Sequence, residues 1–238
     1  MTETALALSF PPLMSGEAVT GLEDPFETAC KRAVLGCDAG LVVYNLAPDT
    51  VRAALVFAPE VPLSQAMAML PTCGVGFQNA LGALAPPEVA VHLEWNGAIR
   101  INGARCGTLR AAASTSDPAE VPDWLVIGLE LPLWPADGDG GDSPDQTALY
   151  AEGCADVEAP ALIESWARHC LHWINRWEEE GAKHLHADWR ELAHGIGEPV
   201  QEGGFSGTFL GIDEAFGMLL RDDETTHLIP LTELLETP

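Results

Sequence analysis

The dipeptide Asn102-Gly103, set between two short apolar stretches, is the sequence feature that most constrains the fold. Asn-Gly is the preferred centre of the tight turn that joins two antiparallel strands. Residues 98–101 and 104–111 are therefore predicted to pair as a β-hairpin. Apolar and polar residues alternate over 89–95, which predicts another strand, because successive side chains of a strand point to opposite faces. This part of the chain is expected to lie in a β-sheet.

Other stretches predict a mixture of strands and helices. Runs rich in apolar and β-branched residues predict strands at 41–44, 51–58 and 124–131. Apolar residues with helical spacing predict helices at 25–35, 61–84, 161–180 and 187–193. Asp24 is expected to cap the first helix, with Pro25 at its first position. The second helix is expected to break near Cys73-Gly74.

The last fifty residues differ in character from the rest. Short apolar runs separated by turn residues predict four strands, at 199–200, 205–210, 216–220 and 227–230, as in a small barrel. We therefore predict an α+β protein with two domains, residues 1–186 and residues 187–238. The acidic, glycine-rich stretch 135–147 has too few apolar residues to pack and is predicted to be a surface loop.

Composition excludes several classes of partner. The chain has 238 residues, 47% of them hydrophobic, which is enough for a full core. Its 36 acidic and 11 basic residues give a net charge of -25, so nucleic acids and anionic membranes would be repelled. No apolar run is long enough to span a membrane, and the first residues lack a basic leader, so we expect a soluble cytoplasmic protein. The six cysteines contain no CxxC pair and are expected to be reduced and mostly buried.

Several segments, in the same order, resemble one known family. Residues 94–103 read Glu-Trp-Asn-Gly-Ala-Ile-Arg-Ile-Asn-Gly and are similar to the biotin protein ligase pattern K-W-P-N-D-L-V-V-N-G. Residues 105–109 resemble the K-x-x-G-I-L strand of these enzymes, one residue shorter, and residues 126–130 stand where they have V-I-G-I-G-I-N. Residues 207–213 and 217–220 are similar to their small C-terminal domain. The chain thus resembles the biotin/lipoate protein ligase family from about residue 26 to residue 235.

The resemblance implies a fold, substrates and partners. The expected fold is a mixed β-sheet packed with helices, of the class II synthetase and biotin-ligase type, followed by a small SH3-like barrel. Family members activate a carboxylic acid, such as biotin or lipoate, with ATP and transfer it to a lysine of a carrier protein. The resemblance alone implies ATP and biotin or lipoate here, and no cofactor is certain. It also implies a carrier-type partner, although these carriers tend to be acidic like this chain, and it allows a homodimer formed through the main sheet.

The residues that carry the family's chemistry are mostly missing. Forming an acyl-adenylate brings a carboxylate against a triphosphate, so the site needs fixed cations and N–H donors. The family supplies many of them from a G-R-G-R-R-G loop, but the corresponding segment 45–50 has neither glycine nor arginine. The lysine of K-W-P-N-D is matched by Glu94, and its Asn and Asp are matched by Gly97 and Ala98. Only Arg105 keeps a cation, opposite a second family lysine.

The hairpin motif supplies the candidate ligand-binding site. Its predicted residues are Glu94, Trp95, Asn96, Arg105, Cys106 and Gly107. Two interpretations stay open for Glu94 and Arg105, a retained ligand-binding pair or a salt bridge between adjacent strands. Trp95 lines an acyl pocket or belongs to the core. No catalytic residue is assigned.

Two other residue groups suggest chemistry that we do not adopt. His169, His172, His184 and His186 are near one another in sequence, but no zinc signature such as HExxH includes them, and no metal site is predicted. Octanoyltransferases related to the family use a cysteine with a lysine partner. Cys106 or Cys170 would be the cysteine here, yet neither has a lysine near it in sequence.

Three hypotheses about function remain. The first is a divergent ligase-like protein without ATP-dependent ligase activity that binds at most a small carboxylic acid or a carrier-type partner. The second is an active ligase or acyltransferase with a rearranged site, in which Arg105, Arg100 or Arg110 supplies the charge. The third is a structural or regulatory module that has lost its pocket. Whether the chain is an enzyme is left undecided by the sequence.

Overall fold

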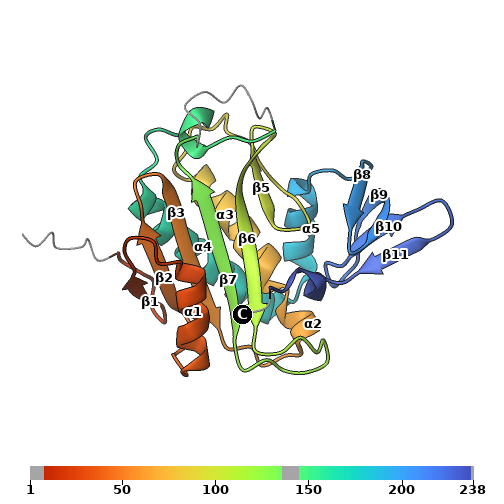
Figure 1. The fold of residues 1–238 in the computed structure, drawn as a ribbon, viewed down its shortest axis with the longest axis horizontal. Coiled ribbons are helices and arrows are strands. Elements are labelled where there is room, and N and C mark those ends of the chain that lie inside the picture. Colours follow the sequence, from red (N-terminus) through yellow and green to blue (C-terminus); the bar gives the residue numbers. More distant parts are fainter. Residues whose placement is uncertain (1–7, 136–144, 237–238) are drawn as a thin grey trace, which may run out of the picture.

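The computed structural model describes residues 8–135 and 145–236, which form a main sheet flanked by helices and a smaller C-terminal sheet (Figure 1). Its elements are β1 (Ser15–Ala18), α1 (Pro25–Val34), β2 (Leu41–Leu46), β3 (Thr50–Phe57), α2 (Leu63–Ala66), α3 (Met69–Gly82), β4 (Val91–Leu93), β5 (Ala98–Ile101), β6 (Ala104–Ala113), β7 (Leu125–Pro132), η1 (Leu149–Glu152), α4 (Ala159–Glu180), α5 (Lys183–Leu192), β8 (Pro199–Glu202), β9 (Phe205–Ile212), β10 (Met218–Arg221), β11 (Thr226–Ile229) and η2 (Leu231–Leu234). Across these described residues, no helix has both the length and the apolar character needed to cross a membrane.

The main sheet has seven strands in the order β1-β2-β3-β7-β6-β5-β4. The edge strand β1, which was not predicted, pairs with β2 in parallel, and the other neighbours pair antiparallel. The β5–β6 hairpin turns at Asn102 and Gly103, whose φ angles of 51° and 95° are those of a tight hairpin turn. The predicted hairpin is therefore confirmed, and its turn fixes the register of the candidate site.

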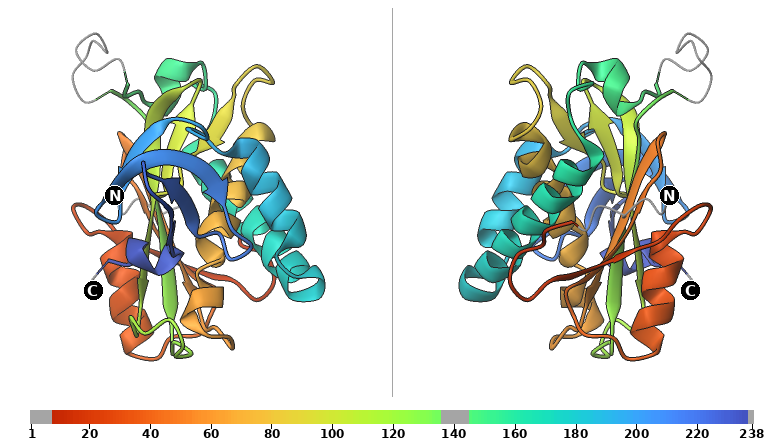
Figure 2. Two further views of the ribbon diagram at one scale, coloured as in Figure 1. Left: turned by 90° about the vertical axis from the view of Figure 1, so that its right-hand side faces the viewer. Right: turned by 90° about the vertical axis from the view of Figure 1, so that its left-hand side faces the viewer.

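Helices cover both faces of this sheet. Figure 2 shows α3 and α4 on one side and α1 on the other. In β3, Leu55 and Phe57 join the larger core under α3 and α4, whereas Ala54 and Val56 join the smaller core under α1. Because both faces of β3 are buried, its sequence is a continuous apolar run.

Helix α1 begins as predicted. The side chain of Asp24 accepts a hydrogen bond from the backbone N–H of Phe26 (2.9 Å), and Pro25 is the first helical residue. Phe26 and Ala29 are buried against the sheet. The cap therefore fixes Asp24 at the start of α1, next to the face of the sheet that this helix covers.

The predicted break near Cys73-Gly74 is wrong. The helical region is interrupted earlier, at Met67 and Ala68, and α3 runs through Cys73 and Gly74 without a break. A Cβ at Gly74 would lie 3.0 Å from Leu93 Cδ1, and one at Gly76 would lie 3.0 Å from Cys170 Sγ. These glycines allow α3 to approach β4 and α4 closely, so their role is packing.

Helix α4 packs along α3 through its tryptophans, as its apolar stripe predicts. The indole N–H of Trp166 donates to Cys73 O (3.0 Å), and that of Trp173 donates to Asn79 Oδ1 (2.8 Å). Both indoles are buried. Trp166 and Trp173 therefore belong to the core, whereas Trp177, on the same helix, is only partly buried.

The C-terminal sheet contains the four predicted strands in the antiparallel order β11-β10-β9-β8. It projects beyond the β4 edge of the main sheet (Figure 1). Over the described residues, its edge strands β8 and β11 are not paired with each other, so the SH3-like barrel is not confirmed. Of the predicted loop 135–147, residues 136–144 lie outside the described residues, and Asp145 and Thr147 exchange backbone hydrogen bonds with Arg105.

Candidate functional site

The turn after β4 places the first candidate residues. The Glu94 N–H donates to Ala98 O (2.8 Å), and the Gly97 N–H donates to Glu94 O (3.1 Å). Gly97 has φ +91°, and a Cβ there would lie 2.5 Å from the carbonyl oxygen of Leu109. The backbone of β6 therefore excludes any side chain at this position, which is where the ligase motif has asparagine.

The Glu94 carboxylate binds two arginines at once. Arg105 Nε donates to Glu94 Oε1 (2.8 Å), its Nη2 donates to Oε2, and Arg100 Nε donates to Oε1. The side chains of Glu94 and Arg100 are 11% and 14% exposed, whereas that of Arg105 is 51% exposed. Burial alone would raise the pKa of the Glu94 carboxyl, but hydrogen bonds from Arg105 and Arg100 outweigh it and hold this pKa below its usual value. The Glu94 carboxylate is therefore ionised, and both of its oxygens already accept hydrogen bonds from arginine side chains.

The hairpin register explains why a carboxylate is needed here. Arg100 and Arg105 lie directly opposite each other on β5 and β6. Like charges at such positions repel and destabilise the strand pair. Glu94 neutralises part of this charge, and Arg100 also donates to Gly103 O at the turn. The cluster is thus a salt bridge between adjacent strands in which two arginines share one carboxylate.

Trp95 belongs to the junction between the two sheets. Its side chain is buried, and its indole N–H donates to Phe216 O (2.8 Å), just before β10. Trp95, Trp189 and Phe216 help to line a cavity of about 20 Å³. A cavity of this size holds about one water molecule, so Trp95 does not line an acyl pocket there.

Asn96 also connects the hairpin to the C-terminal sheet. Its Nδ2 donates to Glu202 Oε1 (2.9 Å), and its Oδ1 accepts from the Ala98 N–H (3.2 Å). A second cavity of about 190 Å³ lies beside it, between the two sheets. Of the predicted residues, it gathers Glu94, Trp95, Asn96 and Arg105, and Cys106 and Gly107 are not part of its lining.

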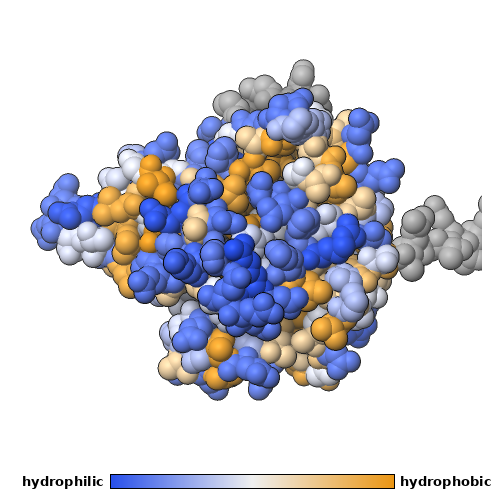
Figure 3. Space-filling view, turned by 180° about the vertical axis from the view of Figure 1, so that it is seen from behind, coloured by the Kyte–Doolittle hydropathy of each residue, from blue (hydrophilic) through white to orange (hydrophobic). Residues whose placement is uncertain are grey.

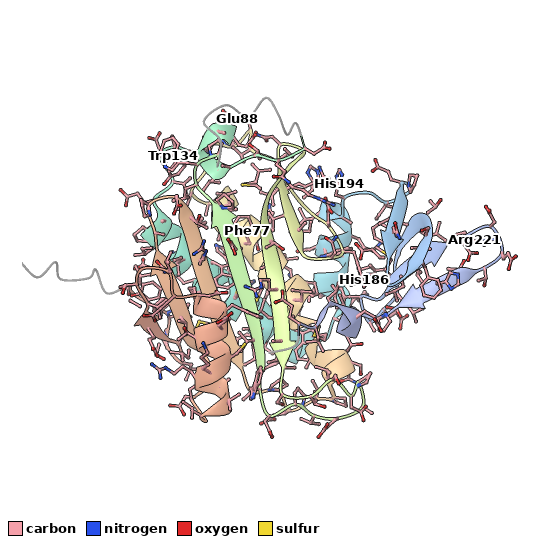
Figure 4. The ribbon with its side chains drawn as sticks, viewed as in Figure 1. Phe77, Glu88, Trp134, His186, His194 and Arg221 are labelled. Atoms are coloured by element: carbon pink, nitrogen blue, oxygen red, sulfur yellow. The ribbon has the colours of Figure 1, made fainter. Side chains whose placement is uncertain are left out.

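Several residues around this cavity were not predicted. Arg100 lines it, although the sequence suggested this residue only as an alternative cation. The hairpin register, which places Arg100 opposite Arg105, is the signal that identifies it. His194, Glu198 and Glu202 come from the C-terminal part, and Figure 4 shows His194 between the main sheet and the C-terminal strands. No sequence pattern links these three residues to the hairpin.

Cys106 is a core residue. It is 4% exposed, and burial raises the pKa of its thiol to about 12. Cys170 is fully buried between α3 and α4, and burial raises the pKa of its thiol well above the usual value. A thiol must ionise to act as a nucleophile. Neither cysteine is therefore suited to the acyltransferase chemistry of the octanoyltransferases.

Gly107 allows β6 and β7 to approach closely. A Cβ at this position would lie 2.7 Å from Glu130 O and 2.8 Å from Leu131 Cδ1. The residue pairs with Ile99 next to the irregularity in the β5–β6 register. The structure gives Gly107 a packing role.

The connection between β2 and β3 is a short turn of three residues. Leu46 ends β2, Thr50 begins β3, and Leu133 N–H donates to Asp49 O (2.7 Å) inside the turn. The cation nearest in sequence, Arg52, pairs with Glu130 at 3.4 Å. This connection offers no arginine to an anionic ligand.

Arg110 lies in a second ion cluster. Its guanidinium binds Asp24 (3.0 Å) and Glu236 (2.7 Å) and lies 4.3 Å from the centre of the Phe26 ring. The Glu236 N–H donates to Ala111 O (2.8 Å), which attaches the C-terminal segment to β6. Arg110 is therefore fully engaged beneath α1 and does not line the cavity that holds Glu94.

The four histidines considered above do not assemble into a site. His169 and His172 lie on α4, His184 lies near Glu180 (3.5 Å), and His186 contacts Asp213 O (3.0 Å). Figure 4 shows His186 on α5, apart from His194. No group of three or more potential metal ligands forms within residues 8–135 and 145–236.

Comparison with known families gives two matches. Residues 10–191 match the biotin/lipoate A/B protein ligase family. Residues 196–237 match a domain family of unknown function, DUF4444. None of the curated proteins compared with the chain matches it.

Solved structures give the same result for the fold. A biotin protein ligase-like protein of unknown function from Silicibacter sp. TM1040 is 71% identical, with a TM-score of 0.92, and the match covers 97% of this chain and 100% of that one. The biotin protein ligase of Aquifex aeolicus is 14% identical, with a TM-score of 0.72 and coverage of 93% and 96%. That enzyme has also been solved in complex with biotin and ATP, in a structure that matches with a TM-score of 0.69, 14% identity and coverage of 90% and 95%.

Proposed function

Because this chain belongs to the biotin/lipoate A/B protein ligase family, we propose that it is a divergent member without ATP-dependent ligase activity. In this proposal the chain keeps at most the ability to bind a small carboxylic acid, such as biotin, lipoate or another acyl group, or a carrier-type protein. The observation that carries the proposal is the double occupation of Arg100 and Arg105 by the Glu94 carboxylate.

Adenylate formation needs cations that are free to meet a triphosphate. Arg100 and Arg105 already share one carboxylate, and Arg110 is held by Asp24 and Glu236. An ATP molecule at this edge of the sheet would have to displace a carboxylate that is only 11% exposed. Removing one partner from a buried ion pair is strongly destabilising, so this displacement opposes nucleotide binding.

The short β2–β3 turn supports the same conclusion. A phosphate-binding loop presents several backbone N–H groups and cations to its ligand. Three residues between Leu46 and Thr50, with no glycine or arginine among them, are too few to enclose a triphosphate. The residues present therefore do not fit ATP.

The cavity of about 190 Å³ is the one that Arg100 and Arg105 line. Arg100 and Arg105 share Glu94, and Arg105 is half exposed, although Glu198 and Glu202 also line this cavity. A guanidinium has five N–H donors, more than Glu94 uses on Arg105. A second carboxylate could therefore bind the outer side of Arg105 without removing Glu94, which favours a small acid as the ligand. The same exposed cation is the feature that favours the alternative, an active ligase or acyltransferase with a rearranged site.

Two further parts of the proposal concern organisation. We place the domain boundary at 186/187, a point that lies within helix α5 (Lys183–Leu192), and this helix packs on α3. All six cysteines are free, and five of them are buried, which fits a reducing compartment such as the cytoplasm. We leave homodimerisation through the main sheet as an option that size-exclusion measurements will decide.

Thermal unfolding with biotin, lipoate, octanoate or ATP and magnesium tests the function. A ligand at about 100 times its dissociation constant stabilises the folded state by about 2.7 kcal/mol, which moves the midpoint by a few degrees. We expect a shift with an acid and none with ATP. Arg105→Gln should abolish the acid shift, and Arg52→Gln, which removes an arginine that lines a different cavity, should leave it intact.

A pyrophosphate-release assay completes the test. Acid-dependent release of pyrophosphate from ATP would refute the proposal and establish the active ligase. No shift with any acid and no release of pyrophosphate would favour the third hypothesis, a module without a pocket.

A further inference from the structure

A large cavity lies on the helical side of the main sheet. It has a volume of about 910 Å³ and lies between the C-terminal half of α4, α2, the end of β3 and the turn before β10. We call it the α4 groove and define it by Phe57, Glu60, Met69, Ile174, Glu178 and Glu214. It shares no lining residue with the cavity that holds Glu94. The two cavities can therefore be tested independently.

The base and wall of the α4 groove are apolar. Phe57 and Met69 are 9% and 5% exposed and belong to the main core. On α4, Leu171, Ile174 and Glu178 all line the groove, and their spacing of three and four residues places them on one face of the helix. Ile174 is only partly buried. This face of α4 thus presents apolar side chains to an open space large enough for a ligand or peptide.

The rim of the groove is acidic. Glu60, Glu178 and Glu214 line it, and none of them has a basic partner within 4.0 Å in the part of the chain that the structure describes. No lysine, arginine or histidine is among the described lining residues. On the same helix, Glu180 is instead paired with Arg176 (2.8 Å). The groove therefore combines an apolar base with uncompensated negative charge.

Figure 3 shows the face that carries α4. Hydrophobic side chains lie among hydrophilic ones across the lower half of this view. An occupant that complements such a surface has an apolar side and cations at its margins. Amphipathic helices with lysine or arginine beside an apolar stripe have this chemistry. The net charge of -25 would also accelerate the approach of such a partner.

We propose that the α4 groove is a docking site for a basic amphipathic helix of a partner protein. The apolar stripe of that helix packs on Ile174 and Phe57, and its lysines or arginines pair with Glu60, Glu178 and Glu214. A helix suits this groove because its acidic residues come from three separate parts of the chain, Glu60 before α2, Glu178 on α4 and Glu214 before β10, around an apolar base.

Fluorescence anisotropy with a labelled leucine–lysine helical peptide of about 18 residues, five helical turns, tests this proposal on the full-length chain. Two further peptides serve as ligand controls. One keeps the leucine stripe and replaces lysine by glutamate, and the other keeps lysine and replaces leucine by serine. We expect saturable binding of the first peptide only, weakening as salt is added.

Matched charge reversals locate the binding. Glu178 lines the groove and Glu179, its exposed neighbour on α4, does not. Glu178→Lys should weaken peptide binding by about tenfold or more, and Glu179→Lys by less than about twofold, although both change the net charge equally. Ile174→Ser should also weaken binding, and far-UV circular dichroism checks that each variant is folded.

Several outcomes would overturn the proposal. Equal weakening by Glu178→Lys and Glu179→Lys would show attraction to the net charge alone. Equal binding of the glutamate peptide would remove the role of the acidic rim. Binding of an alkyl amine without any peptide binding would assign the groove to a small molecule, and self-association that Glu178→Lys abolishes would assign it to a second copy of the chain.

Discussion

Strand β6 contributes to two ion clusters in which the ratio of acidic to basic side chains is reversed. In the first, one carboxylate, Glu94, is shared by Arg100 and Arg105. In the second, one guanidinium, Arg110, is shared by Asp24 and Glu236. The three side chains of the first cluster carry one net positive charge and border a cavity of about 190 Å³ that Glu198 and Glu202 also line, whereas those of the second carry one net negative charge and border a cavity of about 10 Å³.

The difference shows where a binding function can survive. An arginine enclosed by two carboxylates has no electrostatic reason to accept a third anion. Arg105 is half exposed and shares Glu94 with Arg100, so it keeps N–H donors that can bind an anion, although Asp145 and Glu202 also lie near it. The same strand therefore contains one cluster that is structural and one that can still bind an acid. The variants below test this division, in order of decreasing effect on stability.

The strand segment between the clusters is expected to be the most sensitive point. Gly107→Ala should lower the free energy of unfolding by about 2–3 kcal/mol, because the new Cβ would lie 2.7 Å from Glu130 O and force β6 away from β7. Urea denaturation measures the loss. Gly82→Ala is the control, since its Cβ would meet no atom closer than 3.9 Å at the end of α3, and it should be neutral or stabilising. Equal effects of the two variants would contradict the packing role of Gly107.

The first cluster should depend strongly on its single carboxylate. Glu94→Gln should cost about 2 kcal/mol, because it leaves Arg100 opposite Arg105 with no charge between them. Urea denaturation at neutral pH gives the value, and added salt should recover part of the loss by screening the two arginines. A loss that is independent of salt would show that repulsion is not its cause.

The pH dependence of the same variant sharpens the assignment. The pKa of Glu94 is held below its usual value of 4.5 in the folded state, so the unfolded state binds more protons as the pH falls. The stability that the Glu94 charge contributes is therefore complete above about pH 4.5 and is lost as the pH falls through the lowered pKa. The difference in unfolding free energy between the wild type and Glu94→Gln should shrink below that pH. A constant difference down to acid unfolding would contradict an ionised Glu94.

The smallest effect is expected in the second cluster. Glu236→Gln should cost about 0.5 kcal/mol, because the Glu236 side chain is 41% exposed and Arg110 keeps Asp24. Differential scanning calorimetry is sensitive enough to compare it with Glu94→Gln. If both variants were equally destabilised, the contrast between the two clusters would be lost.

The sequence predicted most of the fold because local signals were strong. The Asn102-Gly103 turn, the Asp24 cap and the tryptophan stripe of α4 each act within a few residues, so their geometry follows from nearby chemistry. The weakly apolar strand β1 gave no such signal. The break expected at Gly74 was wrong because that glycine serves a contact with β4, which no local pattern contains.

The candidate site also has a part that the sequence predicted and a part that it did not. Glu94, Trp95, Asn96 and Arg105 gather at one cavity, as the hairpin motif suggested, because they are close in sequence on a turn of fixed register. Their roles were not predictable, since the partners of Trp95 and Asn96 come from the C-terminal sheet more than a hundred residues later.

The sequence by itself determined that this chain has a ligase-type hairpin with a reversed charge at Glu94 and no arginine in the β2–β3 connection. Only the tertiary structure decided what each remaining cation does, because it brings Arg100 opposite Arg105, closes Asp24 and Glu236 on Arg110, and opens the α4 groove. The physical reason is the separation along the chain over which each interaction acts. Turn and strand preferences act between neighbours, whereas the neutralisation of a charge depends on whichever side chains the fold brings within a few ångströms of it.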